Sequence, residues 1–182
     1  MKGDNSKLPV PVKIAAEAAM MIALASALSL FKVFRMPQGG SVTLGSMVPI
    51  LLFAMRRGVK YGVLAGILFG FVRLYLSMYV VHPVQLLLDY PLAFGALGLA
   101  GLIKTSKDKP LHAVVGTVAG IGGRFLSHWL SGVVFFAEYA PAGQHPALYS
   151  AIYNGGYLGV ELILSSIIIY TLAKTKVMKI FL

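Results

Sequence analysis

The chain has 182 residues, of which 58% are hydrophobic and only 12% are charged, and its mean hydropathy is +0.81. A soluble domain carries about 25% charged residues, so the composition indicates a polytopic membrane protein and leaves no room for an ATPase or another soluble catalytic domain. Cysteine is absent, which excludes disulfides and thiolate metal sites. We expect an all-α membrane protein with six transmembrane helices in a single domain, residues 1–182.

Six apolar segments follow one another along the chain, separated by polar, glycine-rich or proline-containing connections. The expected spans are residues 13–34, 44–55, 59–78, 82–103, 110–139 and 146–173. A helix needs about 20 residues to cross the hydrocarbon, so the second span, which also contains Pro49, is short. The first apolar run is long enough to remain as a span, and we expect no cleaved signal peptide.

Basic residues mark one side of the predicted bundle. Twelve of the 16 Lys and Arg residues stand at alternate connections, three at each of them. They are Lys2, Lys7 and Lys13 before the first span, Arg56, Arg57 and Lys60 after the second, Lys104, Lys107 and Lys109 after the fourth, and Lys174, Lys176 and Lys179 after the sixth. The positive-inside rule therefore predicts that both termini are cytoplasmic. The net charge of +10 anchors the spans in this interpretation, and we expect no nucleic-acid partner.

An acidic residue lies inside the fourth span. A carboxylate within a span is costly and usually faces the bundle interior or a wet cavity, which makes Asp89 a candidate ligand contact. Pro91 cannot donate a backbone hydrogen bond, so it opens the helix beside Asp89, and opened backbone is tolerated in a membrane where it lines a cavity. Gln85 lies one turn earlier on the same helical face. The alternative is a structural ion pair between Asp89 and Arg73 or Arg124.

The junction between the last two spans is rich in aromatic and polar side chains that a plain membrane hairpin does not need. In the fifth span His128, Phe136 and Tyr139 recur at helical spacing, and the sixth span begins with Tyr149 and, a little later, Asn154. We expect this junction to form one wall of a ligand pocket near a membrane face. For the aromatic residues alone, an interfacial belt is the alternative.

No catalytic signature accompanies these residues. The histidines show no metal-ligand spacing, no serine lies in a nucleophile elbow, and no phosphate-binding GxxxxGK[ST] motif is present. Glu161, within the sixth span, is a candidate structural partner of Arg124, and its role stays open. Binding or transport is therefore the leading class of function, and an intramembrane enzyme is disfavoured.

The first span carries a stripe of small side chains. Its members recur at every fourth residue and share one face of the helix; they are Ala15, Ala19, Ala23 and Ala27. Small residues let helices approach closely in a bilayer. The stripe predicts either docking to another protein or close packing inside the bundle.

Several motifs occur in a fixed order over these spans. They are PQGGS at 37–41, MVPILLFAMRRG at 47–58, Tyr79 followed by HPVQLLLDY at 82–90, His128, FFAEY at 135–139, and the segment from Tyr149 to Asn154. In this order, and over essentially the whole chain, they resemble the thiamine-specific substrate-binding subunit (S component) of energy-coupling factor vitamin transporters. That family often has Glu where Asp89 stands and Trp where Phe136 stands.

The resemblance implies six helices, thiamine as the ligand, no cofactor, and an extracellular-side pocket closed by the loop between the first two spans. It also implies an integral membrane coupling subunit and two cytoplasmic ATPases as partners within the lipid bilayer, with the alanine stripe as the docking surface. The ligand contacts that the resemblance implies are Tyr79, Asp89, Tyr90, His128, Phe136, Tyr149 and Asn154. We add Gln85 to these candidates because it shares a helical face with Asp89.

The chemistry of thiamine suits these side chains. A buried carboxylate suits its thiazolium cation or its amino group, and aromatic faces suit both rings through cation–π contacts of about 0.5–2 kcal/mol each. An S component for another vitamin or a thiamine precursor stays open as an alternative. An autonomous secondary transporter is a further alternative, although large secondary transporters often show internal repeats and we find no convincing repeat.

Overall fold

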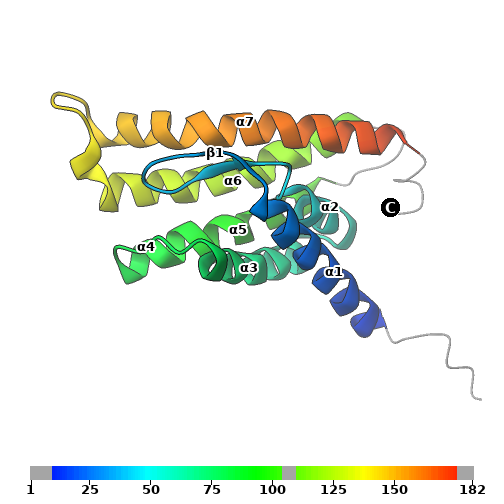
Figure 1. The fold of residues 1–182 in the computed structure, drawn as a ribbon. Coiled ribbons are helices and arrows are strands. Elements are labelled where there is room, and N and C mark those ends of the chain that lie inside the picture. Colours follow the sequence, from blue (N-terminus) through cyan, green and yellow to red (C-terminus); the bar gives the residue numbers. More distant parts are fainter. Residues whose placement is uncertain (1–9, 104–109, 176–182) are drawn as a thin grey trace, which may run out of the picture.

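The computed structural model describes residues 10–103 and 110–175, and these residues are mostly helical. The helices are α1 Val10–Leu30, α2 Val48–Arg57, α3 Val59–Leu76, α4 Pro83–Leu87, α5 Ala93–Gly95, α6 Pro110–Phe135 and α7 Pro146–Lys174. A π-helical turn at Leu88–Leu92 and a 3-10 helix at Ala96–Leu102 join α4 and α5 into one path, and a 3-10 turn at Ala137–Tyr139 follows α6. In Figure 1, α6 and α7 run side by side along the molecule, α3, α4 and α5 form a second group, and α1 crosses at an angle.

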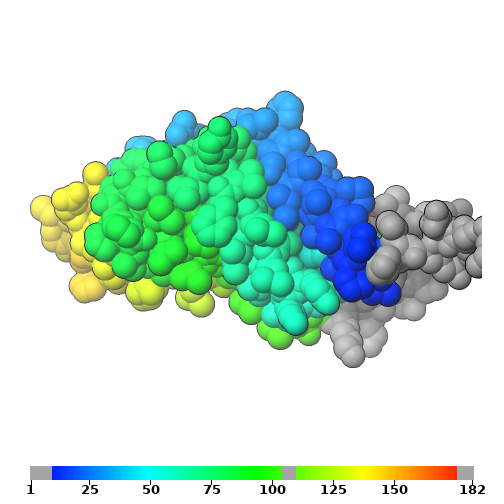
Figure 2. All heavy atoms as spheres, turned by 90° about the horizontal axis from the view of Figure 1, so that it is seen from below, coloured from blue at the N-terminus to red at the C-terminus, as the bar shows by residue number. Residues whose placement is uncertain are grey.

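Several helices have the character of membrane spans. The helices α1, α3, α7 and the path Pro83–Leu102 are long and apolar enough to cross a membrane. In the most apolar 18-residue stretch of each of these helices, between 17% and 50% of the stretch is buried inside the protein. Much of their apolar surface is therefore left to face lipid. Figure 2 shows such a face, on which α1 lies beside α3. The prediction of a helical membrane protein is thereby confirmed.

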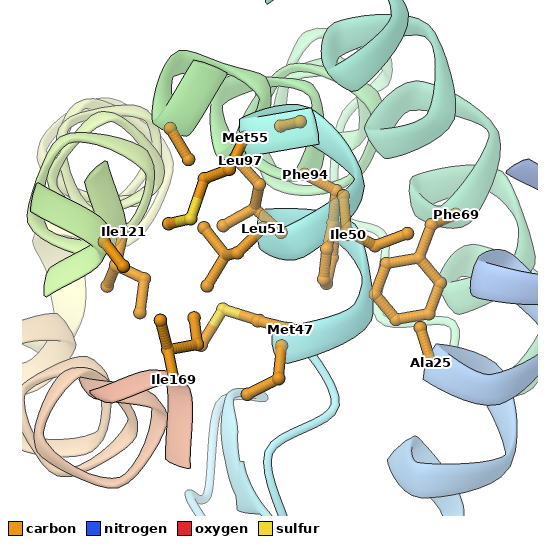
Figure 3. Close-up of a cluster of buried hydrophobic side chains, with 14 of the residues drawn as sticks. Ala25, Met47, Ile50, Leu51, Met55, Phe69, Phe94, Leu97, Ile121 and Ile169 are labelled. Atoms are coloured by element: carbon orange, nitrogen blue, oxygen red, sulfur yellow. The ribbon is translucent and has the colours of Figure 1, made fainter. Parts of the chain in front are cut away.

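The second predicted span is a short core helix. With 10 residues, α2 is only about 15 Å long, roughly half the thickness of the hydrocarbon. Figure 3 shows Ile50 and Leu51 of α2 among Phe94, Ile121 and Ile169, which come from α5, α6 and α7. The apolar character of this segment therefore reflects burial among the other helices, and the helix begins later than the predicted start of the span at residue 44.

Glycines let α3 approach the path Pro83–Leu102 closely. A Cβ atom added to Gly70 would lie 2.6 Å from the carbonyl oxygen of Tyr90, and one added to Gly62 would lie 3.0 Å from the Cα of Gly98. Gly66 is equally confined by the backbone of Phe94. The glycine stripe of α3 thus serves helix packing within the bundle.

A β-hairpin stands where an irregular loop was predicted. Strand β1, Lys32–Arg35, pairs antiparallel with β2, Ser41–Thr43, so the predicted extension of the first span to residue 34 is wrong and the fold is not purely helical. Both Gly39 and Gly40 have positive φ, 89° and 77°, which explains the two glycines at the turn. Glu161 of α7 anchors β2, because its Oε1 accepts hydrogen bonds from the Thr43 backbone N–H at 2.5 Å and hydroxyl at 2.7 Å.

One end of the molecule gathers basic residues. The start of α1 and the end of α7 lie towards the same end in Figure 1. Arg56 and Arg57 at the end of α2 form ion pairs with Glu17 of α1, at 3.3 Å for Arg56 Nε. Seven of the residues used for the topology prediction lie outside the described residues: Lys2, Lys7, Lys104, Lys107, Lys109, Lys176 and Lys179.

The alanine stripe of α1 does not face the bundle. Ala15, Ala19, Ala23 and Ala27 are all exposed. The buried residues of α1 are instead Glu17, Ala25 and Ser29. Close packing inside the bundle is therefore not the role of the stripe in this chain.

Candidate ligand-binding site

A cavity of about 930 Å³, its open mouth included, lies between the hairpin and the ends of α3, α4, α6 and α7. All eight residues predicted as ligand contacts line it: Tyr79, Gln85, Asp89, Tyr90, His128, Phe136, Tyr149 and Asn154. They come from four separate segments of the chain, and the fold brings them together in one place.

The π-helical turn positions Asp89. Pro91 lies inside this turn, as expected from its missing N–H, and the widened turn lies at the cavity wall. Gln85 Nε2 donates to Asp89 Oδ2 at 2.5 Å, and the same amide group donates to the Tyr79 carbonyl oxygen at 3.1 Å. Gln85 is almost fully buried. We infer that it orients the carboxylate.

Asp89 is also hydrogen-bonded to a histidine of α6. His128 Nδ1 lies 2.9 Å from Asp89 Oδ1, while Arg124 Nε donates to His128 Nε2 at 3.2 Å. Because Nε2 accepts, Nδ1 carries the proton and donates it to the carboxylate. The alternative of a direct ion pair between Asp89 and Arg73 or Arg124 is therefore wrong: among the described residues neither arginine forms an ion pair with Asp89, and Arg124 reaches it only through the imidazole ring.

Arg124 and Glu161 are not paired with each other. The Arg124 guanidinium lies 4.1 Å from the ring centroid of Phe94 and contacts the Met47 sulfur at 2.8 Å. Glu161 instead binds Thr43, as described above, and no ion pair joins Glu161 to Arg124 within the described part of the chain. Glu161 thus has a structural role in holding the hairpin.

Aromatic rings form the outer walls of the cavity. Tyr79 and Phe136 stack with ring centroids 6.1 Å apart and an interplanar angle of 22°, and Tyr149 packs beside Tyr153 at 5.9 Å. Burial, followed by the hydrogen bond to the Tyr139 side chain, raises the pKa of Tyr79, so its hydroxyl stays protonated at neutral pH. These faces offer stacking surfaces for a flat heteroaromatic ring.

Tyr90 supports the cavity wall through the hydrogen bonds of its hydroxyl group. Its hydroxyl donates to the Ser77 carbonyl oxygen at 2.9 Å and accepts from the Tyr79 N–H at 2.8 Å. Tyr90 is only 8% exposed. It therefore fixes the segment that carries Tyr79 and presents little of its own surface to the cavity.

Asn154 lies on α7 beside Gly132 of α6. Its Nδ2 donates to the Ser150 carbonyl oxygen at 3.0 Å, and its Oδ1 accepts from the Tyr157 hydroxyl at 3.2 Å. A side chain at Gly132 would collide with Ser150, so a glycine is required there for the two helices to approach. Asn154 is consequently held in one orientation at the inner end of the cavity.

The hairpin tip is attached to α7 over the cavity. The Tyr153 hydroxyl accepts from the Gln38 N–H and donates to the Gly39 carbonyl oxygen, both at 2.9 Å. The ring of Tyr157 lies against Gly40. The residues Gln38, Gly39 and Gly40 were missed as site residues, although the turn-forming PQGGS motif marked the segment.

Basic residues were also missed. Lys32, Arg35, Arg73 and Arg124 line the cavity with a single carboxylate, Asp89. Their positions depend on the hairpin and on the tilt of the helices, which local sequence patterns do not reveal.

Together these features define a membrane-embedded binding protein for a small, flat, polar molecule. The cavity combines fixed polar groups at its inner end with aromatic walls and a closing hairpin, an arrangement typical of a ligand pocket. No group of three or more His, Cys, Asp or Glu side chains suited to a metal ion occurs among the described residues.

Comparisons with known proteins identify the family. The chain matches the family described as Thiamine transporter protein (Thia_YuaJ) over residues 15–181. It is 37% identical over 178 residues to thiamine transporter ThiT of Bacillus subtilis. The aligned region covers 91% of this chain and 90% of that relative. It is 33% identical over 137 residues to thiamine transporter ThiT of Lacticaseibacillus paracasei, 68% of each chain.

A solved structure leads to the same family. ThiT from Listeria monocytogenes matches the fold with a TM-score of 0.84 at 27% identity, covering 95% of this chain and 99% of that chain. The protein belongs to the thiamine transporter protein family. The resemblance drawn from the sequence motifs is confirmed, as is the prediction of a transport protein rather than an enzyme.

Proposed function

We propose that this protein is the thiamine-binding S component of an energy-coupling factor importer and captures thiamine on the extracellular side. One observation carries the proposal: the Asp89 carboxylate, held by His128 and Gln85, faces a cavity with aromatic walls. The relatives named thiamine transporters support the identity of the ligand. The chain itself performs no chemistry on thiamine.

The geometry accounts for recognition of the parts of thiamine. The exocyclic amino group of the aminopyrimidine donates to Asp89, and the stacked pair Tyr79 and Phe136 packs against a ring. Tyr149 and Asn154 supply hydroxyl and amide groups for the remaining polar atoms. Phe136 offers a smaller face than the Trp often found in the family, so stacking contributes less to the affinity in this chain.

Substitution of Asp89 by Asn tests the proposal. The amide keeps the size of the side chain, and its oxygen still accepts the hydrogen bond from His128, although its NH2 group cannot accept the one from Gln85. Loss of a charge-assisted hydrogen bond costs about 1.5–3 kcal/mol, which weakens thiamine binding by about 10- to 150-fold. Calorimetry on purified protein measures the effect, with the exposed Glu138→Gln as the matched control. An unchanged dissociation constant in Asp89→Asn would remove Asp89 from the binding site.

The topology and partners belong to the same proposal. Six helices traverse or enter the bilayer with both termini in the cytoplasm, which is supported by the basic residues at one end of the molecule. An integral membrane coupling subunit, joined to two cytoplasmic ATPases, docks on the exposed alanine stripe of α1. Thiamine accumulation in liposomes that contain this chain alone would contradict the need for a coupling module and would favour the autonomous transporter.

A further inference from the structure

The helix α1 is only lightly embedded in the bundle. In its most apolar stretch 17% is buried, against 28% to 50% in the other three candidate spans. In Figure 1 the start of α1 projects away from the remaining helices. Its buried residues are Glu17, Ala25 and Ser29, and two of these three side chains are small. Few contacts therefore hold α1 in one orientation, and a carboxylate is among them.

The apolar residues of α1 do not select the face that packs on the bundle. Between residues 14 and 30, every side chain is apolar except Glu17, Ser26 and Ser29. Lipid tails are as apolar as a helix interface, so burying one apolar face instead of another changes the free energy little. The hydroxyls of Ser26 and Ser29 donate to carbonyl oxygens of α1 itself. The remaining polar side chain is Glu17, whose partners lie outside α1.

Glu17 binds two arginines in the last turn of α2. Its Oε2 accepts hydrogen bonds from Arg57 Nε at 2.9 Å and from Arg57 Nη2, and its Oε1 lies 3.3 Å from Arg56 Nε. Glu17 is only 8% exposed, and a carboxylate that is buried without its partner is costly. Because a rotation of α1 would separate Glu17 from both guanidinium groups, these ion pairs favour a single rotation of the helix about its own axis.

The alanine stripe lies on the face of α1 opposite Glu17. Successive residues of an α-helix are about 100° apart around the axis. Glu17 is two residues after Ala15 and two before Ala19, so it points roughly 160° away from both of them. The rotation that buries Glu17 against α2 therefore turns the stripe away from the bundle, where its four members are exposed.

We propose that Glu17 is a positioning residue for docking, whose ion pairs with Arg56 and Arg57 set the rotation of α1 and so present the alanine stripe to the coupling subunit. The inference rests on the proposed function, of which docking on the stripe is a part. Within the described residues, none from α1 lines the ligand cavity. Loss of the ion pairs therefore lowers uptake and leaves thiamine binding unchanged.

A spin label can report the rotation of α1 directly, because the chain contains no cysteine. The label is attached to Ala23→Cys of the full chain in nanodiscs, and its accessibility to oxygen, which dissolves in lipid, is measured by electron paramagnetic resonance. We expect an accessible label in the background protein and an additional shielded population when Glu17→Gln is added. Lys13→Gln, which removes a charge from an exposed position of the same helix, is the matched control and should leave the signal unchanged.

Binding and uptake are measured on the unlabelled protein. By calorimetry, Glu17→Gln should bind thiamine within about twofold of the unsubstituted protein. Its ATP-dependent uptake with a coupling module should fall roughly tenfold, the weight of one charge-assisted hydrogen bond. The exchange of charges in Glu17→Arg with Arg57→Glu should restore both the spin-label signal and most of the uptake, because the ion pair forms again in the opposite sense.

Several outcomes would overturn the positioning role. An unchanged spin-label signal in Glu17→Gln would do so, as would normal uptake despite a changed signal. Loss of thiamine binding that the charge exchange does not repair would assign the ion pairs to the overall fold. Should Glu17→Gln not fold, Arg57→Gln, which leaves Arg56 beside the carboxylate, must show the same loss of uptake with normal binding, or the proposal is wrong. Failure of the unsubstituted protein to take up thiamine with a coupling module would instead contradict the proposed function.

Discussion

The attachment of the hairpin to α7 gives a sharp prediction. In Tyr153→Phe the ring remains and only the hydroxyl is lost, so the packing against Tyr149 and Tyr157 is kept. The substitution removes two hydrogen bonds to the hairpin tip, one from the Gln38 N–H and one to the Gly39 carbonyl oxygen. We expect the hairpin to open more readily and thiamine to dissociate faster.

The magnitude follows from these two bonds. An intramolecular hydrogen bond contributes about 0.5–1.5 kcal/mol net, and both bonds lie at the partly exposed tip, where water replaces them after opening. Their loss therefore destabilises the closed hairpin by about 1–3 kcal/mol, which corresponds to a dissociation rate raised about 5- to 150-fold. Association should change much less, because ligand enters through the open state.

Stopped-flow displacement of labelled thiamine by excess unlabelled ligand measures the rate. Tyr170→Phe, which removes the same hydroxyl from the far end of α7, is the matched control and should dissociate as the unsubstituted protein does. An unchanged dissociation rate in Tyr153→Phe would show that the hairpin tip does not retain the ligand.

Further predictions follow from α1, α6 and α7. Trp129 Nε1 donates to the Ala147 carbonyl oxygen at 3.0 Å. We expect the fluorescence of Trp129 to change when thiamine binds. If calorimetry shows binding and the fluorescence does not change, the contact between Trp129 and Ala147 is not affected by the ligand. Ala19→Trp and Ala23→Trp should bind thiamine normally and fail in ATP-dependent uptake with a coupling module, because the bulky ring separates docked helices; normal uptake would refute docking there. Glu161→Gln should lower the melting temperature, since weakening a charged hydrogen bond costs about 1.5–3 kcal/mol; an unchanged value would deny its role in anchoring β2.

Helix starts were predictable because prolines mark them. The expected fifth and sixth segments begin at Pro110 and Pro146, and the expected fourth begins at residue 82, directly before Pro83; each of these prolines is the first residue of an observed helix. The short apolar segment around α2 was interpreted as a span because periodicity alone does not distinguish lipid contact from core burial. The hairpin was missed because its strands pair across a turn and are held by Glu161, a contact 118 residues distant in sequence.

The polar end of the cavity was predictable from the cost of charge in a membrane. Asp89 drew attention for that reason, and Pro91 marked the distorted turn beside it. The hydrogen-bond partner of Asp89 was not predictable in the same way, because His128 reaches the carboxylate only when α6 packs beside the turn that carries Asp89. Arg73 and Lys32 were missed because a basic residue near a helix end is normally explained by the membrane interface.

The central claim is that the cavity binds thiamine. Isothermal titration calorimetry of the purified full chain tests it most directly, with thiamine, riboflavin and biotin titrated in turn under identical conditions. We expect saturable binding of thiamine at one site per chain, no binding heat from riboflavin or biotin, and a dissociation constant for thiamine about 10- to 150-fold higher in Asp89→Asn. Tight binding of another vitamin together with no heat from thiamine would contradict the account.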